Sequence, residues 1–157
     1  MKILGQNPNN NDSYEAEAGE VDEDFIEKMS MFDMAEEAIQ KMINKLNISA
    51  DAKHLLYKIS GSTIRVGKFI MKVGRKIIDF VCKIYDEFPQ ATFGAILGAI
   101  AGVLVASIPI IGIVLGAIVT PLAVAFGLVT GASHDFKNKN LDRKIAEANA
   151  QFSPLNA

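Results

Sequence analysis

The feature that most constrains this chain is a long segment without charge. Residues 93–132 are forty residues with no Asp, Glu, Lys or Arg, and they include seven glycines and two prolines. A chain of 157 residues leaves much of its apolar surface in contact with water even when it is folded. The flanking segments are too short to cover so much apolar sequence, so the composition favours a bilayer over a protein core.

The length of this segment predicts two helical spans. Residues 88–107 and 109–131 each reach roughly 30 Å as helices, which is the thickness of the hydrocarbon core of a bilayer. A break is expected between them, because proline removes a backbone donor and glycine permits a turn. The hairpin turn is assigned to Ser107, Pro109 and Gly112. We therefore predict an all-α fold in which a transmembrane helical hairpin occupies residues 88–132 and amphipathic cytoplasmic helices precede it.

The small residues of both spans recur at four-residue steps, which places them on one face of a helix. In lipid, such faces let two helices approach closely. The packing residues predicted on this basis are Gly94, Gly98, Gly102, Ala106, Gly112, Gly116, Thr120, Gly127 and Gly131. They either join the two spans of one monomer or also join neighbouring copies. The second span carries two offset sets, separated by a predicted hinge at Pro121, so we predict a homo-oligomer.

The segments before the uncharged run carry charge of opposite sign. Residues 12–37 contain eleven acidic residues and one lysine, whereas residues 38–85 contain ten basic residues and two aspartates. Residues 62–87 are expected to form one helix with a wide apolar face and a basic stripe, the pattern of a helix in a membrane interface. A bundle helix with a basic solvated edge is the alternative. The predicted membrane-surface residues are Arg65, Lys68, Lys72, Arg75, Lys76 and Lys83.

The remaining segments are expected to be cytoplasmic. Residues 1–21 are typical of a disordered acidic tail. Residues 22–61 predict a helical region whose Phe25–Leu46 seam packs either on its own neighbours or on a partner helix, and Ser49 is expected to cap a short helix there. Residues 133–157 predict a C-terminal tail with a short amphipathic helix. Because basic residues flank both spans, the positive-inside rule predicts a multi-pass inner-membrane protein with both termini cytoplasmic.

No constellation of residues that supports catalysis is visible in the sequence. Cys82 is the single cysteine, and His54 and His134 lie far apart without carboxylates at ligand spacing. The motifs of phosphate-binding loops, dinucleotide folds and serine hydrolases are absent. The basic segment has too wide an apolar face for a nucleic-acid reader. The sequence therefore predicts a protein that is not an enzyme, with no metal, no cofactor and no nucleic-acid partner.

The run from Gly94 to Gly102, with a glycine at every fourth position, resembles the glycine-zipper segments of channel and pore-forming membrane proteins. Two apolar helices joined by a tight turn also resemble the hydrophobic hairpin of pore-forming colicins. Colicins enclose that hairpin in a large helical shell, which this chain lacks, so it is more similar to the two-span effectors of bacterial toxin and phage-defence systems.

This resemblance implies a small oligomeric channel or pore-forming effector that permeabilises or depolarises the bacterial inner membrane. The lipid bilayer and further copies of the chain would be its partners, and the acidic N-terminal segment would restrain it. The alternative is a non-conducting, membrane-anchored adaptor that recruits a cytoplasmic regulatory protein through its N-terminal helices.

Overall fold

An antiparallel sheet and a set of helices form the described part of the chain. In this computed structural model, residues 2–7, 12–17, 23–32, 34–88, 92–125 and 139–155 are described. The elements, in chain order, are β1 (Lys2–Asn7), β2 (Asp12–Glu17), α1 (Glu23–Met31), α2 (Glu36–Asn44), α3 (Ala50–Ser60), β3 (Thr63–Val66), β4 (Phe69–Met71), α4 (Val73–Glu87), α5 (Phe93–Ser107), α6 (Pro109–Ala125), α7 (Lys139–Ala150) and a final 3-10 turn (Ser153–Leu155). The predicted all-α fold is wrong, because these residues include a four-stranded sheet.

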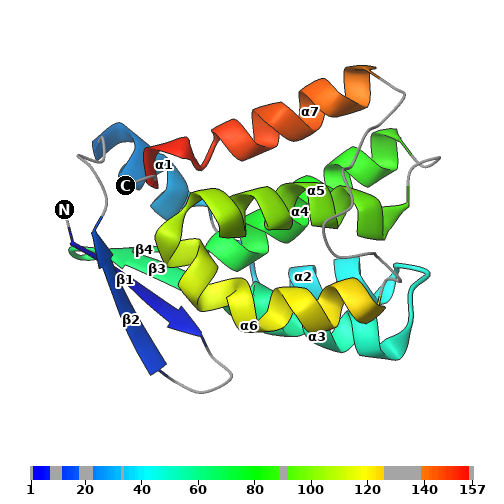
Figure 1. The fold of residues 1–157 in the computed structure, drawn as a ribbon, viewed down its shortest axis with the longest axis horizontal. Coiled ribbons are helices and arrows are strands. Elements are labelled where there is room, and N and C mark those ends of the chain that lie inside the picture. The colour runs from blue at the N-terminus through cyan, green and yellow to red at the C-terminus, as the bar shows by residue number, and fades with distance from the viewer. Residues whose placement is uncertain are drawn as a thin grey trace.

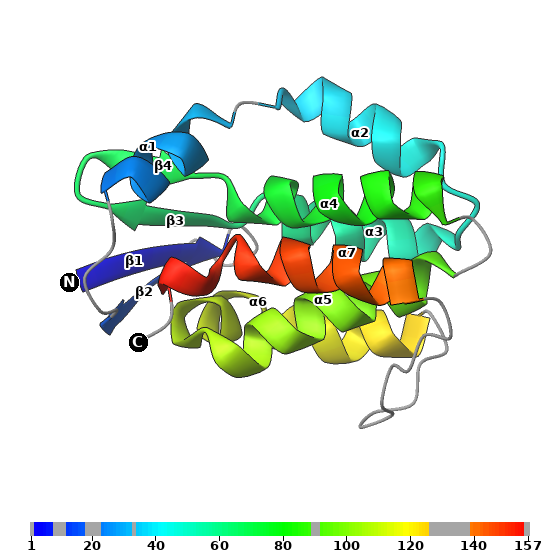
Figure 2. The same cartoon turned by 90° about the horizontal axis from the view of Figure 1, so that it is seen from above.

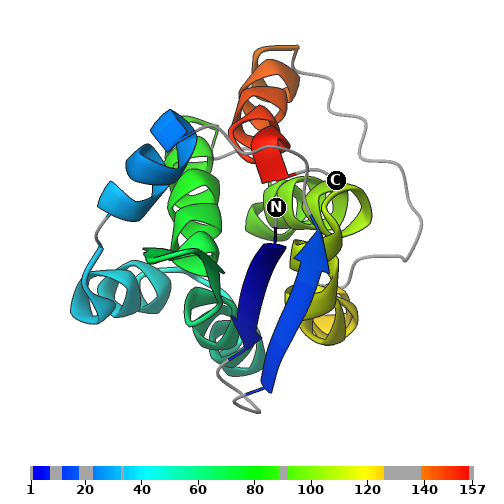
Figure 3. The ribbon, with the colours of Figure 1, turned by 90° about the vertical axis from the view of Figure 1, so that its left-hand side faces the viewer.

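The sheet has the strand order β2-β1-β3-β4, and its strand pairs are antiparallel. The β3–β4 hairpin turns through Gly67 and Lys68, where Gly67 has a φ of 59° that residues with a side chain rarely adopt. Alternation along the strands leaves Arg65 exposed and turns Ile64 and Met71 to the covered face, where both are fully buried. Figure 3 shows the sheet at one end of the molecule with helices behind it.

Helix α6 covers the sheet and brings the uncharged segment into the core. It lies against β1, β2 and α3, while α5 packs against α6, α4 and α7 (Figures 1 and 2). A Cβ added to Gly5 would lie 2.4 Å from Cγ2 of Val114, so this strand glycine lets α6 approach β1 directly. Buried aliphatic side chains of the sheet and the helices join in one hydrophobic cluster.

Helices α3 and α4 cross in close contact. Helix α3 begins after Ser49, whose Oγ accepts a hydrogen bond from the backbone N–H of Ala52 at 3.1 Å, and the helix ends before Gly61. The predicted Ser49 cap is therefore confirmed. In the first turn of α4, Gly74 lies so close to α3 that an added Cβ would be 1.7 Å from the carbonyl oxygen of Ile59. The crossing has room for glycine and for no larger residue.

Residues 62–87 do not form the predicted single basic helix. Strands β3 and β4 occupy most of the first ten residues, and α4 begins only at Val73. Gly67 permits the tight turn, β-branched residues favour the extended β3, and pairing of β3 with β1 holds the hairpin in place. The regular spacing of basic residues across this segment is therefore not the periodicity of one helix face.

The N-terminal segments belong to the sheet and the core. The residues predicted as a disordered tail include β1 and β2, which pair along their whole length. The predicted Phe25–Leu46 seam is divided between α1 and α2 instead of following one helix. Ile39 and Ile43 of α2 are buried, and Phe25 and Leu46 pack against the same hydrophobic cluster. The seam is thus used for packing within the chain.

The two apolar helices are shorter than the spans predicted for them. Helix α5 has 15 residues and α6 has 17, whereas a span needs about 20. Among the described residues, no helix is both long enough and apolar enough to cross a bilayer. Side chains such as Ile100 and Ile111 are instead fully buried against other parts of the chain.

The predicted transmembrane hairpin, and with it the membrane, pore and channel assignments and the multi-pass inner-membrane location, are therefore corrected. The physical reason is that the sheet, α3, α4 and α7 supply more apolar surface than their composition indicated. For example, α4 buries Ile77, Ile78 and Val81, and α7 buries Leu141 and Ile145. These faces cover the inward sides of α5 and α6, which the sequence pattern had assigned to lipid.

Candidate functional site

The outward side of α5 and α6 carries no charge, and its exposed side chains are apolar apart from the hydroxyl of Ser107 beside the turn. The two helices meet at Ile108 and lie side by side along one outer side of the molecule (Figures 1 and 2). Val103 and Ile113 are 46% and 45% exposed, although their side chains are wholly apolar. The exposed or half-buried residues that we call the hairpin face are Gly102, Val103, Ala106, Pro109, Ile113 and Gly116. Apolar side chains that are left exposed close together on a surface are typical of sites that proteins cover with a partner.

The glycines of the hairpin divide between internal and external roles. A Cβ added to Gly112 would lie 2.7 Å from the carbonyl oxygen of Val105, so this glycine lets α6 pack closely on α5. A Cβ added to Gly102 or to Gly116 would meet no atom within 4 Å. These two glycines therefore leave open space at the hairpin face, where the backbone of another helix can approach.

The remaining predicted packing residues do not form one stripe. On α5, Gly94 is buried, Gly98 is half-buried and Ala106 is exposed, so the four-residue pattern passes from the interior to the surface. Gly127 and Gly131 lie outside the described residues. The part of the pattern that reaches the surface is thus its end nearest to the turn between α5 and α6.

The residues predicted as turn and hinge lie at the α5–α6 junction and within α6. Helix α5 ends at Ser107, and α6 begins at Pro109, where a missing N–H is tolerated. Thr120 and Pro121 both lie inside α6, which continues to Ala125. Pro121 therefore does not end the helix, and its predicted role as a hinge stays a prediction.

The predicted membrane-surface residues lie on different elements. Arg65 is on β3, Lys68 is in the β3–β4 turn, and Lys72 directly precedes α4. On α4, Nη1 of Arg75 donates a hydrogen bond to the carbonyl oxygen of Met34 at 2.8 Å. The structure does not gather these residues into the single stripe that the spacing predicted.

Lys76 and Lys83 are engaged within the molecule. Nζ of Lys76 lies 4.4 Å from the ring centroid of Phe32 and 4.8 Å from that of Phe80, an aromatic sandwich that attracts a cation. Burial lowers the pKa of Lys76, and the carboxylate of Asp79 opposes this shift. Nζ of Lys83 is 3.0 Å from Oδ2 of Asp79, whose side chain is almost fully buried. Both lysines therefore contribute to local packing around α4.

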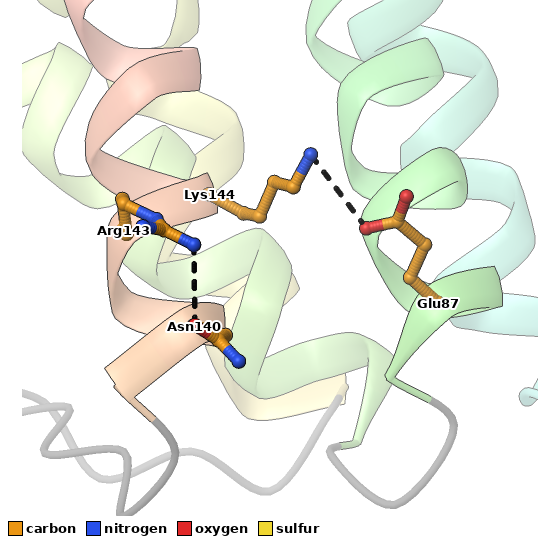
Figure 4. A network of polar contacts seen from close by, with 4 residues as sticks. All are labelled: Glu87, Asn140, Arg143 and Lys144. Atoms are coloured by element: carbon orange, nitrogen blue, oxygen red, sulfur yellow. Dashed lines mark hydrogen bonds and ion pairs between the residues drawn. The ribbon is translucent and has the colours of Figure 1, made fainter.

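A cleft between α4 and α7 is a further surface feature, with a volume of about 250 Å³. Helix α4 lines it with Phe80, Lys83, Ile84 and Glu87. Helix α7 lines it with Lys144, Glu147 and Ala148, and Gln151 lines it directly after the end of α7. Figure 4 shows Lys144 reaching across from α7 to Glu87, with 3.9 Å between Nζ and Oε2. The sequence predictions missed this cleft; within each helix the lining residues follow the spacing of one face, but nothing in the sequence pairs the two faces.

Cys82 is not a reactive centre. Its side chain is buried, and burial together with the carboxylates of Asp86 and Asp79 raises the pKa of the thiol to about 12. The thiol therefore stays protonated, which makes it a poor nucleophile and a poor metal ligand. In the part of the chain that the structure describes, no group of three or more His, Cys, Asp or Glu residues is placed to hold a metal ion. Searches of protein-family models, curated proteins and solved structures find no match to this chain.

Proposed function

We propose that this chain is an assembly module that associates with a second copy of itself through the hairpin face. The observation that carries the proposal is the uncharged surface around Val103 and Ile113, two apolar side chains that are each nearly half exposed. Water contact at such side chains is unfavourable by about 25 cal/mol per Å² of apolar surface, so covering them stabilises a complex.

A second copy is the partner that suits this surface best. In a two-fold symmetric dimer the same patch faces itself, so any charge in the patch meets a like charge of its partner or must be placed to avoid it. Between residues 92 and 125 the chain has no Asp, Glu, Lys or Arg, so this repulsion does not arise. The open positions at Gly102 and Gly116 let two such surfaces come close together.

The test is the molecular mass in solution of the wild type and of three variants. Val103→Glu and Ile113→Glu each put a carboxylate on the hairpin face, and Ile70→Glu is the matched control because Ile70 is 48% exposed on the sheet. Sedimentation equilibrium is expected to show a wild-type dimer whose Kd rises at least about tenfold in the two hairpin variants, since burying an unpaired charge is strongly unfavourable. The Ile70→Glu variant is expected to dimerise like the wild type.

Two outcomes would overturn the proposal. One is a wild type that remains monomeric at millimolar concentration. The other is a monomer that co-sediments with phosphatidylglycerol vesicles through the same face, which would make lipid the partner instead of a second copy. Urea unfolding of all four proteins at a dilution where they are monomeric checks that the substitutions leave the fold intact.

The adaptor hypothesis has less support from the geometry. It required the N-terminal seam to be available to a partner, whereas Ile39 and Ile43 are buried and Phe25 and Leu46 pack on the chain's own core. A non-catalytic role and the absence of a nucleic-acid partner stay predictions from the sequence.

A further inference from the structure

The cleft between α4 and α7 combines both signs of charge with an apolar floor. The two helices run antiparallel (Figure 1), so that Glu87 lies near Lys144 at one end of the cleft, while Phe80 and Phe152 stack edge to face at the other, with centroids 5.9 Å apart. Each helix places one lysine and one glutamate along the cleft. Its lining therefore has two positive and two negative groups and no net charge.

The charged groups of the cleft are available to a ligand. The Lys144 and Glu87 side chains are 45% and 57% exposed and their atoms are 3.9 Å apart, a separation at which an ion pair contributes little. Nζ of Lys83 contacts Asp79, but its side chain is 71% exposed and an ammonium group has three donors. Lys144 and Glu87 can therefore turn toward a ligand without disrupting a strong interaction, whereas Lys83 binds a ligand with its remaining donors while it keeps its contact with the buried Asp79.

The floor and the volume of the cleft limit what can bind. Ile84 and Ala148 are buried with only 6% and 4% exposed, so the cleft has an aliphatic base between the charged side chains. A volume of about 250 Å³ is below the roughly 300 Å³ at which pockets for drug-sized molecules begin. The cleft therefore matches a ligand of amino-acid size with an aliphatic part.

We propose that this cleft binds a small zwitterion, namely a free amino acid with an aliphatic side chain. Its carboxylate pairs with the ammonium groups of Lys83 and Lys144, its ammonium pairs with Glu87 and Glu147, and its side chain rests on the aliphatic floor. A ligand with a single charge of either sign gains one such pair and is repelled by the opposite set. The proposal does not depend on self-association, because it uses different helical faces.

The experiment titrates the full chain with L-leucine and follows backbone amide resonances by NMR. Three related probes are titrated in the same way: 4-methylpentanoate keeps the carboxylate, isoamylamine keeps the ammonium, and N-acetyl-leucinamide keeps neither charge. Saturable shifts confined to α4 and α7 are expected with leucine, and binding at least about tenfold weaker is expected with each of the three analogues, since each lost charged hydrogen bond is worth that much.

Two variants remove one charge each without changing the shape of the cleft. Lys144→Gln and Glu147→Gln are expected to weaken leucine binding about tenfold, because each leaves one end of the zwitterion without its partner. Both side chains are exposed, so the fold is retained. Glu36→Gln, an exposed glutamate on α2 away from the cleft, is the matched control and is expected to bind like the wild type.

The results that would overturn the proposal are specific. Equal binding of leucine and 4-methylpentanoate would show a simple anion site, and equal binding of leucine and isoamylamine would show a simple cation site. Shifts scattered over the surface would show that the cleft holds no zwitterion. So would the absence of any shift with millimolar protein and leucine at about 50 times the protein concentration. Unchanged affinity in both glutamine variants would place any leucine site elsewhere.

Discussion

Replacing Gly74 by alanine tests the close contact between α3 and α4. A Cβ at this position would lie 1.7 Å from the carbonyl oxygen of Ile59 and 2.8 Å from its carbonyl carbon. Both atoms are backbone, so no side-chain rotation relieves the overlap. Helix α4 must move away from α3 by roughly 1.3 Å before the Cβ is 3.0 Å from the oxygen, the shortest distance that real Cβ contacts show. Overpacking of a core typically destabilises by 1–3 kcal/mol and occasionally by more. We expect a loss of about 3 kcal/mol in the free energy of unfolding.

The sign of this effect separates packing from helix propensity. Alanine is the better helix former by about 1 kcal/mol, so without the crossing Gly74→Ala would stabilise α4. Gly102→Ala is the matched control, because this helical glycine has no atom within 4 Å of the added Cβ. At a concentration where the protein is monomeric, Gly102→Ala is expected to be neutral or up to about 1 kcal/mol more stable than the wild type.

Urea unfolding followed by far-ultraviolet circular dichroism measures both variants. Since a domain of this kind has a stability of about 5–15 kcal/mol, the expected loss lowers the unfolding midpoint clearly without abolishing the fold. A Gly74→Ala protein as stable as the wild type would refute the close α3–α4 crossing. So would equal destabilisation by Gly74→Ala and Gly102→Ala.

Three further predictions concern the surroundings of α4. In a double-mutant cycle of Phe32→Leu and Lys76→Met, the coupling free energy is expected to be about 0.5–2 kcal/mol, because each change removes one side of the same cation–π contact. Additive effects of the two substitutions would contradict this contact. Native Cys82 is expected to resist Ellman's reagent at pH 8 and to react at once in urea, since burial raises the pKa of its thiol to about 12; rapid reaction of the native protein would show an open core. The unfolded thiol ionises near pH 8.5, whereas the folded thiol stays protonated to about pH 12. The contribution of the thiol to the free energy of unfolding is therefore complete below the unfolded pKa and is lost as the pH rises toward the folded one. Cys82→Ala is expected to reduce this loss.

Elements with strong local signals were predictable from the sequence. The Ser49 cap and the glycine after Ser60 fix both ends of α3 within a few residues of chain. The apolar side chains of Leu141, Ile145 and Ala148 recur at helical spacing, and all three are buried where α7 packs. In both cases the information lies within one or two helical turns.

The sheet was not predictable in the same way, because its pairs are distant in sequence. Strand β1 pairs with β3 about 60 residues later, and neither β1 nor β2 shows strict alternation of apolar and polar residues. The β3–β4 hairpin did carry a local signal, with β-branched and aromatic residues on either side of Gly67. The helical spacing of basic residues through the same segment obscured that signal.

For the two candidate sites as well, some features could be predicted from the sequence and others depend on packing. The sequence indicated that the α5–α6 region is uncharged and rich in small residues, but not which of its glycines face outward; only the packing of the hairpin separates Gly112 from Gly102 and Gly116. The α4–α7 cleft exists because two helices about 60 residues apart in the sequence lie side by side, so it cannot be recognised from the sequence of either helix alone.

By itself, the sequence determined that residues 93–125 avoid charge, that they turn back near Ser107, and that several flanking helices are amphipathic. Only the tertiary structure decided what covers the apolar run. Lipid tails and aliphatic side chains cover an apolar helix equally well, since both remove it from water. In this chain the sheet, α3, α4 and α7 supply that cover on the inward side, and the hairpin face is the part they leave open.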